Sequence, residues 1–89
     1  MKQARILIEG RLQRMNFRLQ TQQQAQKLDL VGFIRNLSDG RIEIEVQGEE
    51  NKIEEMLQWC QQEPHNSQIR SILYRLEEPT KNYTDFAVR

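Results

Sequence analysis

The hydrophobic period of the sequence changes within residues 42–60, and this change most constrains the fold. In residues 42–47 apolar and polar side chains alternate strictly, which is typical of a half-buried strand. In residues 53–60 the apolar side chains instead recur at i, i+3, i+4 and i+7, which predicts an amphipathic helix over residues 50–62. Pro64 ends that helix. A strand followed closely by a helix of this kind indicates a mixed α and β protein.

The other segments extend this pattern. Residues 17–28 lack glycine and proline and predict a second helix. Asp39-Gly40 is a strong signal for a turn between two strands. Further strands are predicted at residues 6–8, 30–34, 69–76 and 86–88. The order is βαββαβ plus a short terminal strand, which predicts an α+β, ferredoxin-like (split βαβ) sandwich with an antiparallel sheet and both helices on one face.

Size and composition exclude several classes of protein. The chain of 89 residues predicts a single domain over residues 1–89. Lys plus Arg and Asp plus Glu are both 13, so the net charge of zero argues against nucleic acid as a partner. No segment approaches the roughly 20 apolar residues of a membrane span. Cys60 is the only cysteine and no signal peptide is visible, so we expect a cytoplasmic protein without disulfides.

Residues 10–18 lead from the first strand into the first helix, where backbone N–H groups can bind an anion. Arg18 lies at the helix entrance, and a guanidinium can bind two oxygens of one phosphoryl group. A second polar cluster, residues 35–40, includes the carboxamide of Asn36. Together they predict an oxyanion site. With one histidine and one cysteine, the sequence offers no cluster of metal ligands and needs no cofactor.

These two segments resemble the motifs of the acylphosphatase family. Residues 10–18 read G-R-L-Q-R-M-N-F-R and residues 32–40 read G-F-I-R-N-L-S-D-G. The resemblance extends to Glu43, to residues 46–48 (V-Q-G) and to the final residues 86–89 (F-A-V-R).

The resemblance implies metal-independent hydrolysis of acyl phosphates, which are small molecules, by a monomer without a cofactor. Arg18 matches the arginine that binds phosphate, and Asn36 matches the asparagine that orients the attacking water. Together with Arg18, the loop before it is implied to bind the phosphate through the backbone amides of Gln13, Arg14, Met15, Asn16 and Phe17.

The chain departs from the family at Arg14, where glycine is usual. Arginine there strains the loop if the position needs a left-handed backbone, or crowds the pocket, or adds a second cation that binds phosphate. Arg14 therefore motivates an alternative, a catalytically weak module that binds phosphate or a carbamoyl-phosphate-like ligand. A weaker alternative is a ferredoxin-like scaffold for protein interactions. Glu63-Pro64 replaces the family's Gly-Pro, which affects a helix end more than the chemistry.

Several other residues are given structural interpretations. Cys60 lies on the apolar face of the second predicted helix and is expected in the core, with Trp59 at its border. Arg11 and Arg35 are expected to be solvated. His65 follows Pro64 and has no cluster of partners in the sequence, so we expect a solvated loop residue.

Overall fold

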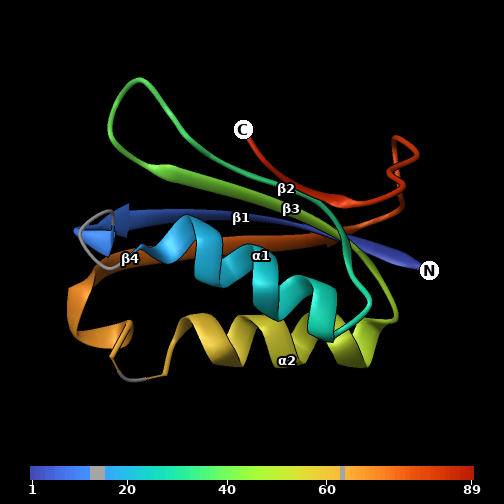
Figure 1. Cartoon of the computed structure of the whole chain (residues 1–89), viewed down its shortest axis with the longest axis horizontal. Helices are drawn as coiled ribbons and strands as arrows, with labels where there is room; N and C mark the ends of the chain where they lie inside the picture. Colours follow the sequence, from blue (N-terminus) through green and yellow to red (C-terminus); the bar gives the residue numbers. More distant parts are fainter. Residues whose placement is uncertain (13–15, 63) are drawn as a thin grey trace.

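The computed structural model describes residues 1–12, 16–62 and 64–89. One sheet is covered on one face by two helices (Figure 1). The elements, in chain order, are β1 (Lys2–Gly10), α1 (Phe17–Lys27), β2 (Val31–Asn36), β3 (Ile42–Gly48), α2 (Glu50–Cys60), a 3-10 turn η2 (Asn66–Gln68), β4 (Ile69–Glu77) and β5 (Phe86–Val88). In the described part of the chain, neither helix is long and apolar enough to cross a bilayer.

The strand order is β4-β1-β3-β2-β5. The first four strands of this order are antiparallel neighbours, as the ferredoxin-like prediction requires. β5 pairs with β2 in parallel, with Gly32 opposite Phe86. The predicted α+β fold is therefore confirmed, with a mixed edge on an otherwise antiparallel sheet. Helix and strand periods alone do not reveal the direction in which a short terminal strand pairs.

The core lies between the sheet and the helices. Alternate residues of β1 and β3 point toward the helices and are fully or almost fully buried: Ala4, Ile6, Ile8, Ile42, Ile44 and Val46. The apolar face predicted for α2 is confirmed, because Ile53, Met56, Leu57 and Cys60 are buried. Phe17, the first residue of α1, is also fully buried. This packing holds the beginning of α1 against the sheet.

The opposite face of the sheet is less exposed than the alternating pattern of β3 predicts. The side chain of Glu43 is only 3% exposed and pairs with Arg5 and Arg35, at 2.6 Å in each case. Gln47 is also buried, and its amide group donates to the side-chain oxygen of Gln3 at 2.8 Å. Arg35 is about half exposed, as expected, but it is an ion-pair partner rather than a free surface residue.

Two glycines, one in each motif, allow neighbouring backbones to approach closely. At Gly10, a Cβ atom would collide with the carbonyl oxygen of Gln68, and the next residue, Arg11, donates its N–H to that oxygen at 3.0 Å. At Gly32, φ is +138° and a Cβ atom would collide with the carbonyl oxygen of Glu45. These are the first residues of the two motifs, so glycine is required there by packing and backbone geometry.

Candidate active site

Arg18 is the second residue of α1, and its side chain lines a cavity of about 250 Å³. Phe17, buried beside it, anchors the helix start in the core, whereas Arg18 is exposed. The cavity is formed by the beginning of α1 together with residues from β3 and β5. Its lining residues are Asn16, Phe17, Arg18, Leu19, Gln22, Ile42 and Val88.

Asn36 is the last residue of β2 and is exposed at the same end of the sheet. In the register of β2 with β3, Asn36 lies opposite Ile42. Asn36 does not line the cavity of Arg18, but its strand partner Ile42 does. The strand register thus brings the two predicted catalytic residues to the same region, although they lie 18 positions apart in the chain.

The beginning of α1 has no carboxylate to balance its helix dipole. Its N-cap residue, Asn16, is in the left-handed region with φ of 56° and makes no capping hydrogen bond through its side chain, and the first turn contains no acidic residue. By contrast, α2 has Glu50 in its first turn. No acidic group of the described ranges forms an ion pair with Arg18. A helix start without a carboxylate in its first turn, next to a guanidinium without an ion-pair partner in this part of the chain, favours an anionic ligand.

The acylphosphatase family model matches residues 4–88. The chain belongs to the acylphosphatase family. It is 33% identical to the acylphosphatase of Roseiflexus sp. over 99% of this chain and 95% of that protein.

Two solved acylphosphatases have the same fold. That from Bacillus subtilis superposes with a TM-score of 0.89 and 27% identity, covering 100% of this chain and 99% of that one. That from Coxiella burnetii has a TM-score of 0.87 and 26% identity, covering 99% and 92%. Family membership makes this chain a hydrolase acting on acyl phosphates and does not favour the alternative of a phosphate-binding module.

The structure describes part of the phosphate-binding loop that the acylphosphatase resemblance implies. Asn16 and Phe17 lie at the start of α1 beside Arg18. Gln13, Arg14 and Met15 lie outside the described residues, so the consequence of Arg14 in place of glycine stays a prediction. In the described part of this loop, Asn16 has a left-handed backbone, and asparagine tolerates that conformation better than most residues.

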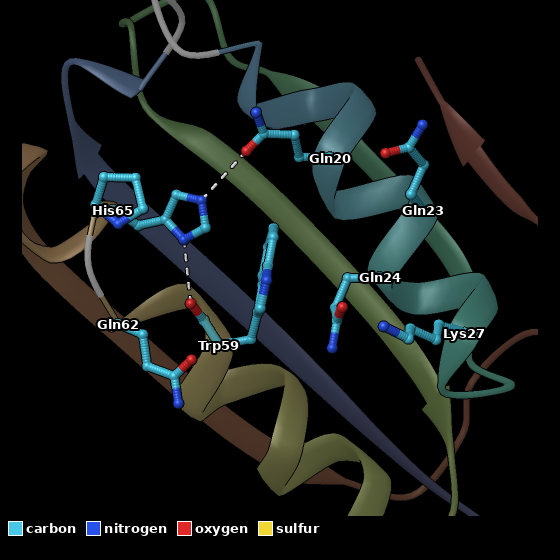
Figure 2. A pocket seen from close by; sticks show the side chains of 8 residues that line it. Gln20, Gln23, Gln24, Lys27, Trp59, Gln62 and His65 are labelled. Atoms are coloured by element: carbon cyan, nitrogen blue, oxygen red, sulfur yellow. Dashed lines mark hydrogen bonds between the residues drawn. The ribbon is translucent and has the colours of Figure 1, made fainter.

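His65 is not the solvated loop residue that the sequence predicts. It is only 4% exposed and lies between the end of α2 and the first turn of α1 (Figure 2). Its Nδ1 is 3.1 Å from the carbonyl oxygen of Trp59, and its Nε2 is 3.3 Å from Oε1 of Gln20. The prediction was wrong because its partners come from two different helices, and only tertiary packing brings them together.

The hydrogen-bond partner of Nδ1 places a proton on that nitrogen of His65. A backbone carbonyl only accepts, so Nδ1–H donates to Trp59. The carboxamide of Gln20 either accepts from Nε2–H of the charged ring or, turned over, donates to Nε2 of the neutral ring.

Aromatic packing surrounds this histidine. The rings of Phe17 and Trp59 stack with centroids 5.7 Å apart, and the His65 ring meets both edge-on, at 5.1 Å from Phe17 and 4.4 Å from Trp59. Trp59 is partly buried against the core, as predicted for a residue at its border.

A polar groove of about 410 Å³ separates α1 from α2 beside this aromatic cluster (Figure 2). It is lined by Gln20, Gln23, Gln24, Lys27, Trp59, Gln62, Pro64 and His65. It shares no lining residue with the cavity of Arg18. The groove and the cavity of Arg18 therefore lie on different sides of the beginning of α1.

Cys60 is a core residue, as predicted. It is fully buried, and burial raises the pKa of its thiol to about 12, so a thiolate nucleophile does not form near neutral pH. Within the described ranges, no three His, Cys, Asp or Glu side chains gather in a way that could hold a metal ion.

Proposed function

We propose that this acylphosphatase hydrolyses the carboxyl–phosphate bond without a metal, with Arg18 binding the phosphoryl group and Asn36 orienting the attacking water. The observation that supports these roles is that Arg18 shares a cavity with Ile42, the strand partner of Asn36, at a helix start that has no carboxylate in its first turn. The guanidinium and the first amides of α1 would face the phosphoryl oxygens. The carboxamide would hold water on the side of β2.

The chemistry needs little more than positioning and charge stabilisation. The water oxygen forms a bond to phosphorus while the bond from phosphorus to the acyl oxygen breaks. The products are a carboxylate and inorganic phosphate, and the protons of the water are shared between phosphate and solvent. A carboxylate is a good leaving group and needs little acid assistance, so Arg18 and backbone amides suffice to stabilise the charge. Asn36 accepts a hydrogen bond from the water and fixes its approach.

We further propose that residues 1–89 act as one acylphosphatase domain, as a monomer and in the cytoplasm. The order of elements over the whole chain and the family match over residues 4–88 support the single domain. The balanced charge supports a small molecule rather than a nucleic acid as partner.

Kinetics of single variants with benzoyl phosphate, in the presence of EDTA, test the two roles. Arg18→Ala should lower kcat/KM by about a hundredfold or more and abolish inhibition by inorganic phosphate, because the charged donor is lost. Asn36→Ala should lower kcat by a similar factor but leave inhibition by phosphate unchanged. Arg70→Ala is the matched control. The Arg70 side chain is 81% exposed, and its ion pair with Glu9 is long, at 3.9 Å, so this variant should behave as wild type.

Wild-type turnover in either active-site variant would refute the role given to that residue. Phosphate inhibition retained in Arg18→Ala would likewise contradict phosphate binding by the guanidinium. Binding of phosphate by a wild-type protein that hydrolyses no acyl phosphate would instead support the binding module suggested by Arg14.

A further inference from the structure

We infer that His65 is a positioning residue that fixes the direction of Arg18 by joining the end of α2 to the first turn of α1. The inference rests on the proposed role of Arg18 in binding the phosphoryl group. His65 does not line the cavity of Arg18, so it acts through the helix and not on the substrate.

On the side of α2, His65 is held by a rigid partner. Nδ1 donates to the carbonyl of Trp59, which belongs to the last turn of the helix. The same carbonyl also accepts the backbone N–H of Gln62 at 3.3 Å, so the bond from His65 is made to an oxygen that the end of the helix already holds in place. The Trp59 indole lies against the His65 ring and against the core. The imidazole therefore has a fixed position relative to α2.

On the side of α1, the same ring contacts Phe17 and Gln20. These residues are three positions apart and share one helix face, since each residue turns the helix by about 100°. Arg18 lies between them in sequence and points about 100° away from Phe17. Figure 2 shows Gln20 directed from α1 toward the imidazole. Holding that face against His65 therefore fixes the side from which Arg18 leaves the helix.

The first turn of α1 depends on such tertiary contacts. Asn16 provides no side-chain cap, and helix ends fray when their terminal groups lack partners. Besides the burial of Phe17, a hydrogen bond ties this part of the helix to the sheet two residues after Gln20, where Gln22 donates to the carbonyl of Phe86 at 2.9 Å. When a group that binds the substrate is displaced by about 1 Å, the reaction rate can fall by about a hundredfold. The residues that hold the first turn thus control how well Arg18 binds phosphate.

A matched pair of amide variants separates the two hydrogen bonds of His65. Glutamine places its amide near the position of Nε2 and can keep the link to Gln20. Asparagine places its amide near the position of Nδ1 and can keep only the bond to Trp59. Both variants lose the ring, so both lose similar aromatic packing. If His65 were merely a core residue, the two variants would differ in stability alone.

The test compares inhibition by inorganic phosphate and kcat/KM for benzoyl phosphate at a temperature where every variant is folded by circular dichroism. We expect His65→Asn to raise the phosphate inhibition constant about tenfold relative to His65→Gln, with a similar loss of kcat/KM. Ile53→Ala is the control. It removes core packing from the other end of α2, so it should lower the melting temperature but leave phosphate inhibition as in wild type.

Equal phosphate inhibition in His65→Asn, His65→Gln and wild type would overturn the inference while leaving the proposed function intact. An equal weakening in Ile53→Ala would overturn it too, because loss of stability alone would then account for the effect. A folded wild-type protein that neither binds phosphate nor hydrolyses benzoyl phosphate would overturn the proposed function and, with it, this role of His65.

Discussion

Replacing Glu43 by glutamine should lower the stability of the fold strongly, although Glu43 lies on the sheet face away from the helices. Its two carboxylate oxygens accept three hydrogen bonds: Nε of Arg35 at 2.6 Å, and Nε and Nη2 of Arg5 at 2.9 and 2.6 Å. Glutamine keeps the shape but replaces one acceptor oxygen by an amide that points N–H groups at a guanidinium. At least one charged hydrogen bond is lost, while the side chain at position 43 stays buried.

The magnitude lies between two limits. Exposed ion pairs contribute about 0 to 1 kcal/mol, whereas breaking a fully buried pair costs about 3 to 5 kcal/mol. The carboxylate is 3% exposed, but the two arginines are 45% and 48% exposed and remain partly hydrated. We therefore expect a loss of about 2 kcal/mol at neutral pH. For a domain of this size, that loss lowers the melting temperature by about 8 to 16 °C.

The pH dependence gives this prediction a second signature. Burial pushes the pKa of Glu43 upward, but the hydrogen bonds from Arg35 and Arg5 outweigh burial and lower the pKa below its usual 4.5. A carboxyl group with a lowered pKa in the folded state stabilises the fold above its unfolded pKa, and this contribution is lost as the pH falls through the folded value. The difference in free energy of unfolding between wild type and Glu43→Gln should therefore shrink as the pH falls below about 4.5.

Thermal and urea unfolding of both proteins across this pH range measure the effect. Glu55→Gln is the control, because the Glu55 side chain is 53% exposed and its partner Lys52 is 3.4 Å away. That change should stay within about 0.5 kcal/mol of wild type. A Glu43→Gln variant as stable as wild type at neutral pH, or a gap that does not change on acidification, would refute the electrostatic account of this face.

Two further predictions concern titrating groups. Cys60 should resist alkylation in the folded protein at neutral pH and react on unfolding, because burial raises its pKa to about 12; rapid native-state labelling would contradict its burial. Burial, together with donation of its hydroxyl to Glu45, raises the pKa of Tyr83 from 10.0 to about 12. The stability that this bond contributes should be complete below about pH 10 and fall toward pH 12. Tyr83→Phe should lack this fall, and identical alkaline unfolding of both proteins would disprove it.

Much of the fold is predictable because local periods determine it. The alternation in residues 42–47 and the i, i+3, i+4, i+7 spacing in residues 53–60 each fit one kind of element. The pairing of strands then follows from the element order. The parallel pairing of β5 with β2 was not predicted, since three residues have no period that records direction.

The placement of Arg18 at the beginning of α1 and of Asn36 at the end of β2 follows from the order of elements. Burial of single polar residues does not follow from the order of elements. Glu43 has the alternation of a solvent-facing residue, but arginines of β1 and β2 cover it. His65 has no local pattern at all, since its partners, Gln20 and Trp59, are contributed by two helices. Such residues can be found only once the packing of the elements is known.

The central claim, attack of an oriented water on phosphorus, is tested most directly by hydrolysing benzoyl phosphate in water labelled with heavy oxygen, with EDTA present. The account predicts fast hydrolysis by the folded protein with the label in inorganic phosphate, because the bond between phosphorus and the acyl oxygen is the one that breaks. No acceleration over the uncatalysed reaction, or label in benzoate, would contradict it.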